Sequence, residues 1–166
     1  VRPPGSHFSR WGYTPTMEHL LFFGFVTVLA FLFAKVEIEV EGAFGWAENL
    51  PTWKLPRTAL VSKIFFGNKP ATGYHVWMNL FVLLFVHLPY IFIPFTLQAE
   101  AAMLAFLIFF FTIEDFLWFA LNPAYGIKNF SKEKIWWHAP NWWLFMPRDY
   151  FTGIVIGGFL YWASLS

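Results

Sequence analysis

Cysteine is absent from this 166-residue sequence, which excludes disulfide bonds, thiolate metal ligands and cysteine nucleophiles. Charged residues are also scarce: they make up 13% of the chain, against about 25% in an average soluble domain. The net charge is only +1 and no charge-rich stretch is present, so we expect no nucleic acid among the partners. The sequence also lacks a Gly-rich phosphate loop and a G-x-S-x-G motif, which argues against nucleotide binding and serine-hydrolase chemistry.

Hydrophobic side chains are what the sequence has in excess. They form 58% of the chain, and aromatic residues alone reach 23%, with 23 Phe and 10 Trp. A soluble domain of this length leaves too much of its surface in water to hide so many large apolar side chains. We therefore expect one all-α, polytopic membrane domain over residues 1–166. This length allows about four transmembrane helices.

Four apolar runs mark the expected spans, at about residues 18–35, 75–97, 101–121 and 150–165. Pro89 and Pro94 are expected to kink the second span. The polar residues Gln98–Glu100 predict a very short turn, so the second and third spans form an antiparallel hairpin. Three glycines in the last span predict close packing against another helix.

The two long loops, Lys35–Gly73 and Asn122–Asp149, carry nine of the eleven Lys and Arg residues. The other two are Arg2 and Arg10. Because positive charge favours the cytoplasmic side, we expect both loops inside and both termini outside, in a plasma membrane. Both loops are rich in tryptophan, which favours the headgroup region, so we expect them to lie on the bilayer surface.

Two segments of the first loop have a less obvious structure. Val36–Glu41 alternates apolar and acidic residues, which is typical of a solvated strand. A helix also fits, because Glu37 and Glu41 are four residues apart. The apolar stretch Thr58–Phe66 is too short to span a bilayer and predicts a short interfacial helix.

Glu114 and Asp115 are the most informative residues of the sequence. They lie side by side in an otherwise apolar span, where carboxyl groups are costly and usually functional. The alternative is a structural pair that hydrogen-bonds neighbouring helices. With His138 from the second long loop, they form the predicted catalytic set.

A metal site is the second prediction from these positions. A hairpin reversing near residues 98–99 would put Glu114 level with about residue 83, within roughly 6–12 Å of two histidines along the axis. Oxygen and nitrogen ligands without sulfur suit Fe, Mn or Zn. The spacings lack the histidine boxes of membrane di-iron enzymes. The predicted ligands are His75, His87, Glu37, Glu39, Glu41 and Glu114.

Several segments resemble a family of small, uncharacterised prokaryotic integral membrane proteins. The resemblance is carried by Gly45–Trp53, Pro70–His75, Ile113–Phe119, Leu121–Pro123 and Trp136–His138. It implies a helical membrane fold and no particular activity.

Three functions fit these observations. The first is a metal-dependent membrane enzyme, an oxidoreductase or hydrolase that acts on a lipid or other hydrophobic substrate at the cytoplasmic interface. The second is a small proton-coupled transporter, which with so few spans would act as a homo-oligomer. The third is a structural or assembly subunit whose polar groups only join helices.

Overall fold

The computed structural model describes residues 14–166, most of which are helical, so the predicted all-α class is confirmed. Arg2 and Arg10, used in the orientation argument, lie outside the described residues. The long helices are α1 (Pro15–Glu41), α3 (Gly73–Val86), α4 (Leu97–Leu121) and α5 (Arg148–Ser164). The short helical elements are α2 (Leu60–Phe65), η1 (Leu88–Ile91), η2 (Ile127–Asn129) and η3 (Ala139–Asn141).

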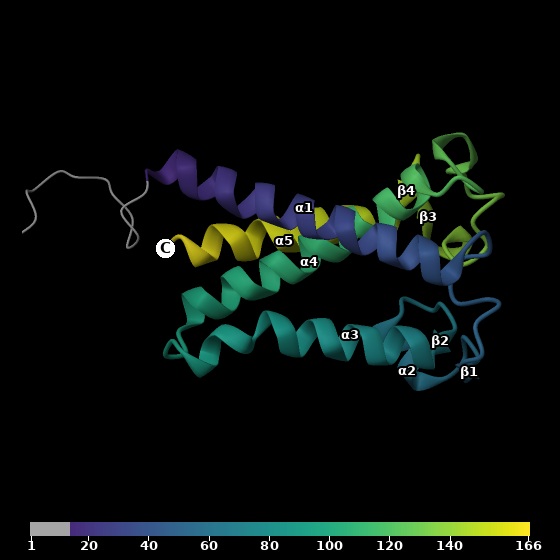
Figure 1. Ribbon diagram of the computed structural model, residues 1–166, viewed down its shortest axis with the longest axis horizontal. Helices are drawn as coiled ribbons and strands as arrows, with labels where there is room; N and C mark the ends of the chain where they lie inside the picture. Colours follow the sequence, from purple (N-terminus) through teal and green to yellow (C-terminus); the bar gives the residue numbers. More distant parts are fainter. Residues whose placement is uncertain (1–13) are drawn as a thin grey trace, which may run out of the picture.

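The long helices run roughly along one axis, and the long loops gather at one end of them (Figure 1). α4 packs against both α1 and α5, whereas α3 contacts α4 much less (Figure 1). Two small antiparallel strand pairs brace the loop end. The strands are β1 (Lys54–Leu55) with β2 (Ala71–Thr72), and β3 (Trp142–Trp143) with β4 (Met146–Pro147).

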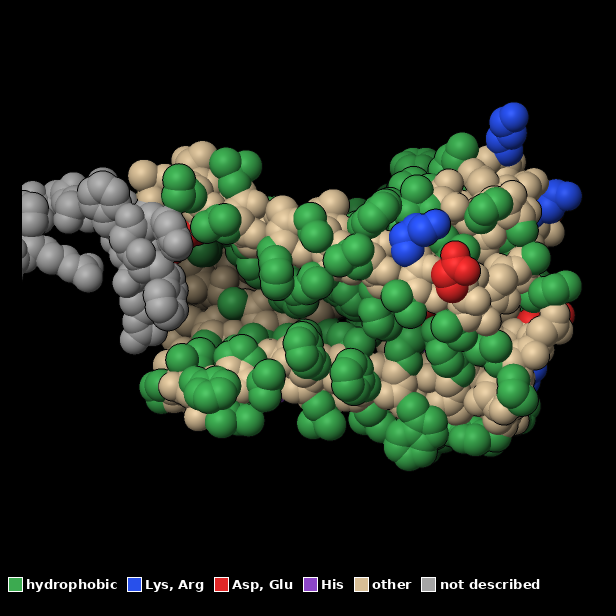
Figure 2. Space-filling view, in the orientation of Figure 1, with side chains coloured by type: hydrophobic (Ala, Val, Ile, Leu, Met, Phe, Trp, Pro, Cys, Tyr) green, Lys and Arg blue, Asp and Glu red, His purple; other side chains and the backbone are tan. Residues whose placement is uncertain are grey.

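The outer surface of the helices is strongly apolar. Phe81, Leu84 and Val155 are each more than two thirds exposed, and on the face drawn in Figure 2 the charged side chains gather at the loop end. Within residues 14–166, α1 and α4 are long and apolar enough to cross a membrane. These two helices weakly support membrane association, and they show neither four spans nor an orientation.

α1 continues well past Lys35, so the strand interpretation of Val36–Glu41 is wrong and the helical alternative is confirmed. The acid-bearing turn stays helical because Glu37 and Ile38 fall on the same buried face as Ala34. The helix ends where Gly42 adopts a positive φ of 65°. A helix at Leu60–Phe65 also matches the short helix predicted there.

The reversal between α3 and α4 lies earlier in the chain than predicted. α3 ends at Val86, and Pro89 lies in a separate 3₁₀ turn, Leu88–Ile91, instead of kinking a longer helix. Gln98–Glu100 are already helical, and Thr96 caps α4 by accepting a hydrogen bond from the Ala99 amide. The predicted turn at Gln98–Glu100 is therefore wrong, and the chain reverses at about residues 92–96.

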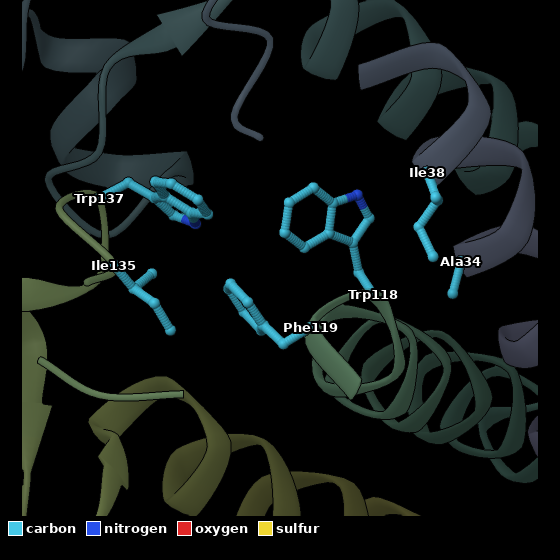
Figure 3. Close-up of a cluster of buried hydrophobic side chains, with 6 residues drawn as sticks. All are labelled: Ala34, Ile38, Trp118, Phe119, Ile135 and Trp137. Atoms are coloured by element: carbon cyan, nitrogen blue, oxygen red, sulfur yellow. The ribbon is translucent and has the colours of Figure 1, made fainter. Parts of the chain in front are cut away.

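The core at the loop end is built around Trp118 and Phe119 of α4. Figure 3 shows these rings between Ala34 and Ile38 of α1 on one side and Ile135 and Trp137 of the second loop on the other. All six side chains are buried. Asn122 closes the same region, because its side-chain amide donates to the Gly42 carbonyl at the end of α1.

Gly153 sets the close approach of α5 to α4, and it supplies a first prediction. A Cβ at this position would collide with Thr112 Oγ1, whereas a Cβ at Gly158 on the same helix would meet nothing within 4 Å. We expect Gly153→Ala to lower the free energy of unfolding by about 1–3 kcal/mol. Gly158→Ala should be neutral or slightly stabilising, because alanine favours the helix. Thermal unfolding in detergent compares the two variants, and equal effects would contradict this packing.

Candidate functional site

A cavity of about 740 Å³ lies at the loop end between α1, α3, α4 and the loops. Part of its wall is apolar, with Leu83 from α3 and Leu107 and Phe111 from α4. The other part carries the ionisable side chains, which come from separate elements of the fold. They are Glu37, Glu41, Lys69, His75, Glu114, Asp115, His138, Asp149 and Tyr150.

Asp115 is the centre of one hydrogen-bonded group. Its Oδ2 lies 3.0 Å from Nε2 of His138 and accepts a hydrogen bond of 2.5 Å from the Tyr150 hydroxyl. A carboxylate accepts, so Nε2 of His138 carries the hydrogen of this pair. Lys69 Nζ lies 3.4 Å from the same Nε2 and 3.8 Å from Asp149 Oδ2. The arrangement holds the imidazole of His138 in one tautomer.

His138 reaches this position because the second loop folds into tight turns. Buried Ile135 anchors the loop in the core, and its carbonyl accepts from the backbone amides of His138 and Ala139. His138 itself is 1% exposed. Its ring is therefore fixed by both the backbone turn and Asp115.

A second group joins Glu41 of α1 to His75 of α3. Thr72 caps α3 and lies 2.7 Å from Nδ1 of His75, so Nε2 faces Glu41 Oε1 at 3.7 Å. The ring of Trp46 stacks on the imidazole with centroids 4.1 Å apart. Glu41 also accepts a 2.6 Å hydrogen bond from the Ala47 amide. His75 is thereby held between a cap, a carboxyl and an indole.

A third group contains the carboxyl groups of Glu37 and Glu114, which both line the cavity. Glu37 accepts a hydrogen bond from the Tyr74 hydroxyl at 3.2 Å, and both glutamic acids are less than a tenth exposed. Two carboxyl groups buried in one site disfavour ionising together, because the like charges repel. The pair can therefore share a proton.

Three buried polar atoms have no hydrogen-bond partner within residues 14–166: Glu114 Oε1, Trp118 Nε1 and His138 Nδ1. All three belong to residues that line the cavity. Buried polar groups in proteins are almost always paired, so each of these three atoms calls for an explanation.

Most of the predicted site residues come together at this cavity. Those that line it are Glu37, Glu41, His75, Glu114, Asp115 and His138. Glu39 instead points outward from α1. His87 lies at the far end of α3, where Nδ1 is 2.6 Å from the Leu83 carbonyl and Nε2 is 3.3 Å from Glu100. Because the chain reverses earlier than predicted, the α3 residue level with Glu114 is close to His75 and not to residue 83.

The sequence interpretation missed Lys69, Tyr74, Trp118 and Tyr150. Tyr74 is next to His75, and Trp118 is four residues after Glu114. This closeness to predicted site residues, within the segments that carry the resemblance, was the signal available in the sequence. Lys69 is in a turn, and Tyr150 is at the start of α5. No spacing in the sequence joins either of them to Asp115.

Among residues 14–166, no group of three or more His, Asp or Glu side chains is arranged to hold a metal ion. Three carboxyl–imidazole pairs lie among these residues: Glu41 with His75, His87 with Glu100, and Asp115 with His138. The first and the third of these pairs line the cavity.

His138 gives the site a defined pH dependence. Burial, and then the nearby Lys69 ammonium, lowers the pKa of His138 below its usual range despite the opposing effect of Asp115. The unfolded chain takes up this proton near pH 6.5, whereas the folded protein resists it. The contribution to stability is present above that pH and is lost as the pH falls towards the folded pKa.

We therefore expect the free energy of unfolding to fall by up to about 1.4 kcal/mol per pH unit below pH 6.5 because of His138. Chemical unfolding measured from pH 7.5 to 5 tests this, with His138→Asn as the comparison. The variant should have a shallower slope than the wild type. Parallel curves would show that His138 is not responsible.

No family model, no curated protein and no solved structure matches this chain.

Proposed function

We propose that this protein is an integral membrane enzyme that carries out acid–base chemistry on a lipid or another hydrophobic substrate. The observation that carries the proposal is the Asp115–His138 pair at the polar end of a largely apolar cavity. Carboxyl and imidazole groups are costly to bury beside apolar walls, and functional sites are where proteins most often accept that cost.

His138 is the proposed general base. With its Nε2 hydrogen directed at Asp115, the neutral imidazole keeps a lone pair on Nδ1, which no group among residues 14–166 uses. That atom can take a proton from a substrate hydroxyl or a water molecule. Asp115 positions the ring and stabilises the imidazolium that forms, with Tyr150 holding the carboxylate in place.

Glu114 is the proposed general acid. A proton shared between the Glu114 and Glu37 carboxyl groups would lie in the same cavity and could pass to a leaving or developing oxygen of the substrate. A base and an acid are then present on one wall, as proton-transfer reactions require. The apolar part of the cavity would hold the hydrophobic chain of the substrate.

The membrane arrangement is part of the proposal. α1, α3, α4 and α5 would each cross the bilayer, with the lysine-rich loops at the cytoplasmic surface and both termini outside. The apolar outer surface of the helices supports this, since a water-facing surface would carry more charge. The cavity would then open at the level of the lipid headgroups, where hydrophobic substrates are available.

The test is turnover by the purified protein in lipid nanodiscs. The protein is incubated with a mixture of long-chain alcohols, amines, acids and esters, and their conversion is measured by mass spectrometry. We expect the wild type to convert at least one of these compound classes. His138→Asn should lower the rate by about 10²–10⁴-fold, the usual range for loss of a general base. Glu39→Gln, on the outer face of α1, serves as the matched control and should retain the wild-type rate.

Other outcomes identify the alternatives. Conversion of nothing by a folded wild type, or an unchanged rate in His138→Asn, would overturn the enzyme proposal. Proton flux in liposomes that Glu114→Gln abolishes would favour the transporter. A stoichiometric amount of Fe, Mn or Zn in the gently purified protein would instead support the metal-dependent form of the enzyme, with Glu41, His75, Asp115 and His138 as the first ligands to mutate.

A further inference from the structure

Two of the unpartnered polar atoms of the cavity are neighbours in the fold. Glu114 and Trp118 are four residues apart on α4, so they lie one above the other on the same helix face. Both residues are buried, with only 4% of their surface exposed. Glu114 Oε1 and Trp118 Nε1 both lack a partner among the described residues.

The two atoms differ in hydrogen-bonding character. The indole Nε1 of Trp118 can only donate, and Glu114 Oε1 offers a lone pair. A group that satisfies both must accept one hydrogen bond and donate another. A hydroxyl does so with a single oxygen, whereas an ammonium has no lone pair for the indole and a carboxylate has no hydrogen for Glu114.

The charge of the cavity also discriminates between head groups. Among residues 14–166, five acidic residues line it, and Lys69 is the one Lys or Arg residue in the same lining. The acids are Glu37, Glu41, Glu114, Asp115 and Asp149. Even with all three glutamic acids uncharged and both lining histidines neutral, Asp115 and Asp149 outnumber Lys69. A carboxylate or phosphate head group would therefore be repelled.

The apolar wall shows where the rest of such a molecule would lie. Leu107 is two turns from Glu114 along α4, about 10 Å at 1.5 Å per residue. Phe111 lies between them, and Leu83 of α3 lines the same space. Since α3 packs loosely on α4, this part of the wall is a groove between the two helices and fits an extended alkyl or isoprenoid chain.

We propose that the ligand of this cavity is a long-chain alcohol, with its uncharged hydroxyl between Glu114 and Trp118 and its chain along the α3–α4 groove. This inference rests on the proposed function only in treating the cavity as the substrate site. It adds the chemical class of the reacting end, and it places that end in the cavity that also holds the His138 base.

Binding of matched twelve-carbon probes tests the assignment without requiring turnover. The purified protein in detergent micelles is titrated with 1-dodecanol, dodecylamine or dodecanoate, and complexes are counted by native mass spectrometry. We expect dodecanol to bind most tightly. Trp118→Phe keeps the ring and removes the donor, so it should weaken dodecanol binding about fivefold, the usual effect of losing one hydrogen bond. Trp136→Phe, an exposed indole outside the cavity lining, should bind like the wild type.

Glu114→Leu is the second variant, used if Trp118→Phe does not fold by circular dichroism, and it should likewise remove the preference for the alcohol. Tighter binding of dodecylamine or dodecanoate, binding of no probe, or equal dodecanol affinity in the wild type and the variants would overturn the inference.

The enzyme proposal fails separately. If dodecanol binding depends on Trp118 but no long-chain compound is converted, the protein binds a long-chain alcohol without acting as an enzyme. Conversion of a substrate without a hydroxyl would contradict the alcohol assignment and leave the enzyme proposal standing.

Discussion

Asp115→Ala should lower the free energy of unfolding by about 3 kcal/mol, at the lower end of the range for breaking a buried ion pair. The carboxylate accepts from His138 and Tyr150, and its removal leaves two buried donors without their acceptor and takes a negative charge away from the neighbourhood of Lys69. The lower end applies because 27% of the Asp115 side chain stays accessible where it lines the cavity.

Asp115→Asn removes the negative charge but keeps the shape of the side chain, so it separates the two contributions to stability. The amide oxygen can still accept one of the two hydrogen bonds, so we expect a smaller loss than for alanine. Unfolding in detergent, followed by circular dichroism, ranks the variants. Glu39→Ala is the surface control and should stay within about 0.5 kcal/mol of the wild type. If Asp115→Ala matched that control, the hydrogen-bonded group would not be structural.

Gly45→Ala should be similarly destabilising, by about 2–5 kcal/mol, for two separate reasons. Gly45 has a φ of 59°, a left-handed conformation that costs an alanine roughly 1–2 kcal/mol. A Cβ there would also lie 2.6 Å from Trp137 Cη2 and 2.8 Å from Trp118 Cη2. Both indoles are buried in the core of Figure 3, where overpacking adds about 1–3 kcal/mol.

Gly42→Ala is the control for a positive-φ glycine without a collision. Gly42 has a φ of 65° and a ψ of −132°, and an added Cβ would meet no described atom within 4 Å. We expect it to lose only conformational energy. A larger loss for Gly45→Ala, measured by chemical unfolding, reports the collision with the tryptophans. Equal losses would show that the indoles move aside freely.

The sequence predicted the helices better than their ends. Long apolar runs identified α1, α4 and α5 because no other regular structure accommodates such runs so readily. The hairpin turn was placed too late because Gln98–Glu100 are polar, yet polar residues also begin helices, and Thr96 is a good cap. Pro89 was expected to kink a helix. It instead lies in a single 3₁₀ turn, and with Pro94 close behind it no α-helix resumes before α4.

The site was only partly accessible from the sequence. Glu114 and Asp115 stand out because carboxyl groups are rare in apolar runs, and the topology brings both long loops to their end of the molecule. His138 was expected at this end, but Lys69 and Tyr150 were not. Whether either of them comes near that carboxyl depends on loop turns with no periodic pattern, including the positive φ angles of Trp46 and Ala47.

The loose packing of α3 on α4 has a thermodynamic consequence. A ligand in the groove between these helices would add contacts to the least supported long helix, and a ligand that binds only the folded state raises stability in proportion to the logarithm of its concentration. The melting temperature of this protein should therefore depend on what it is purified with. Material stripped by harsh detergent should melt lower than material kept with native lipid extract, and adding the extract back should restore the difference.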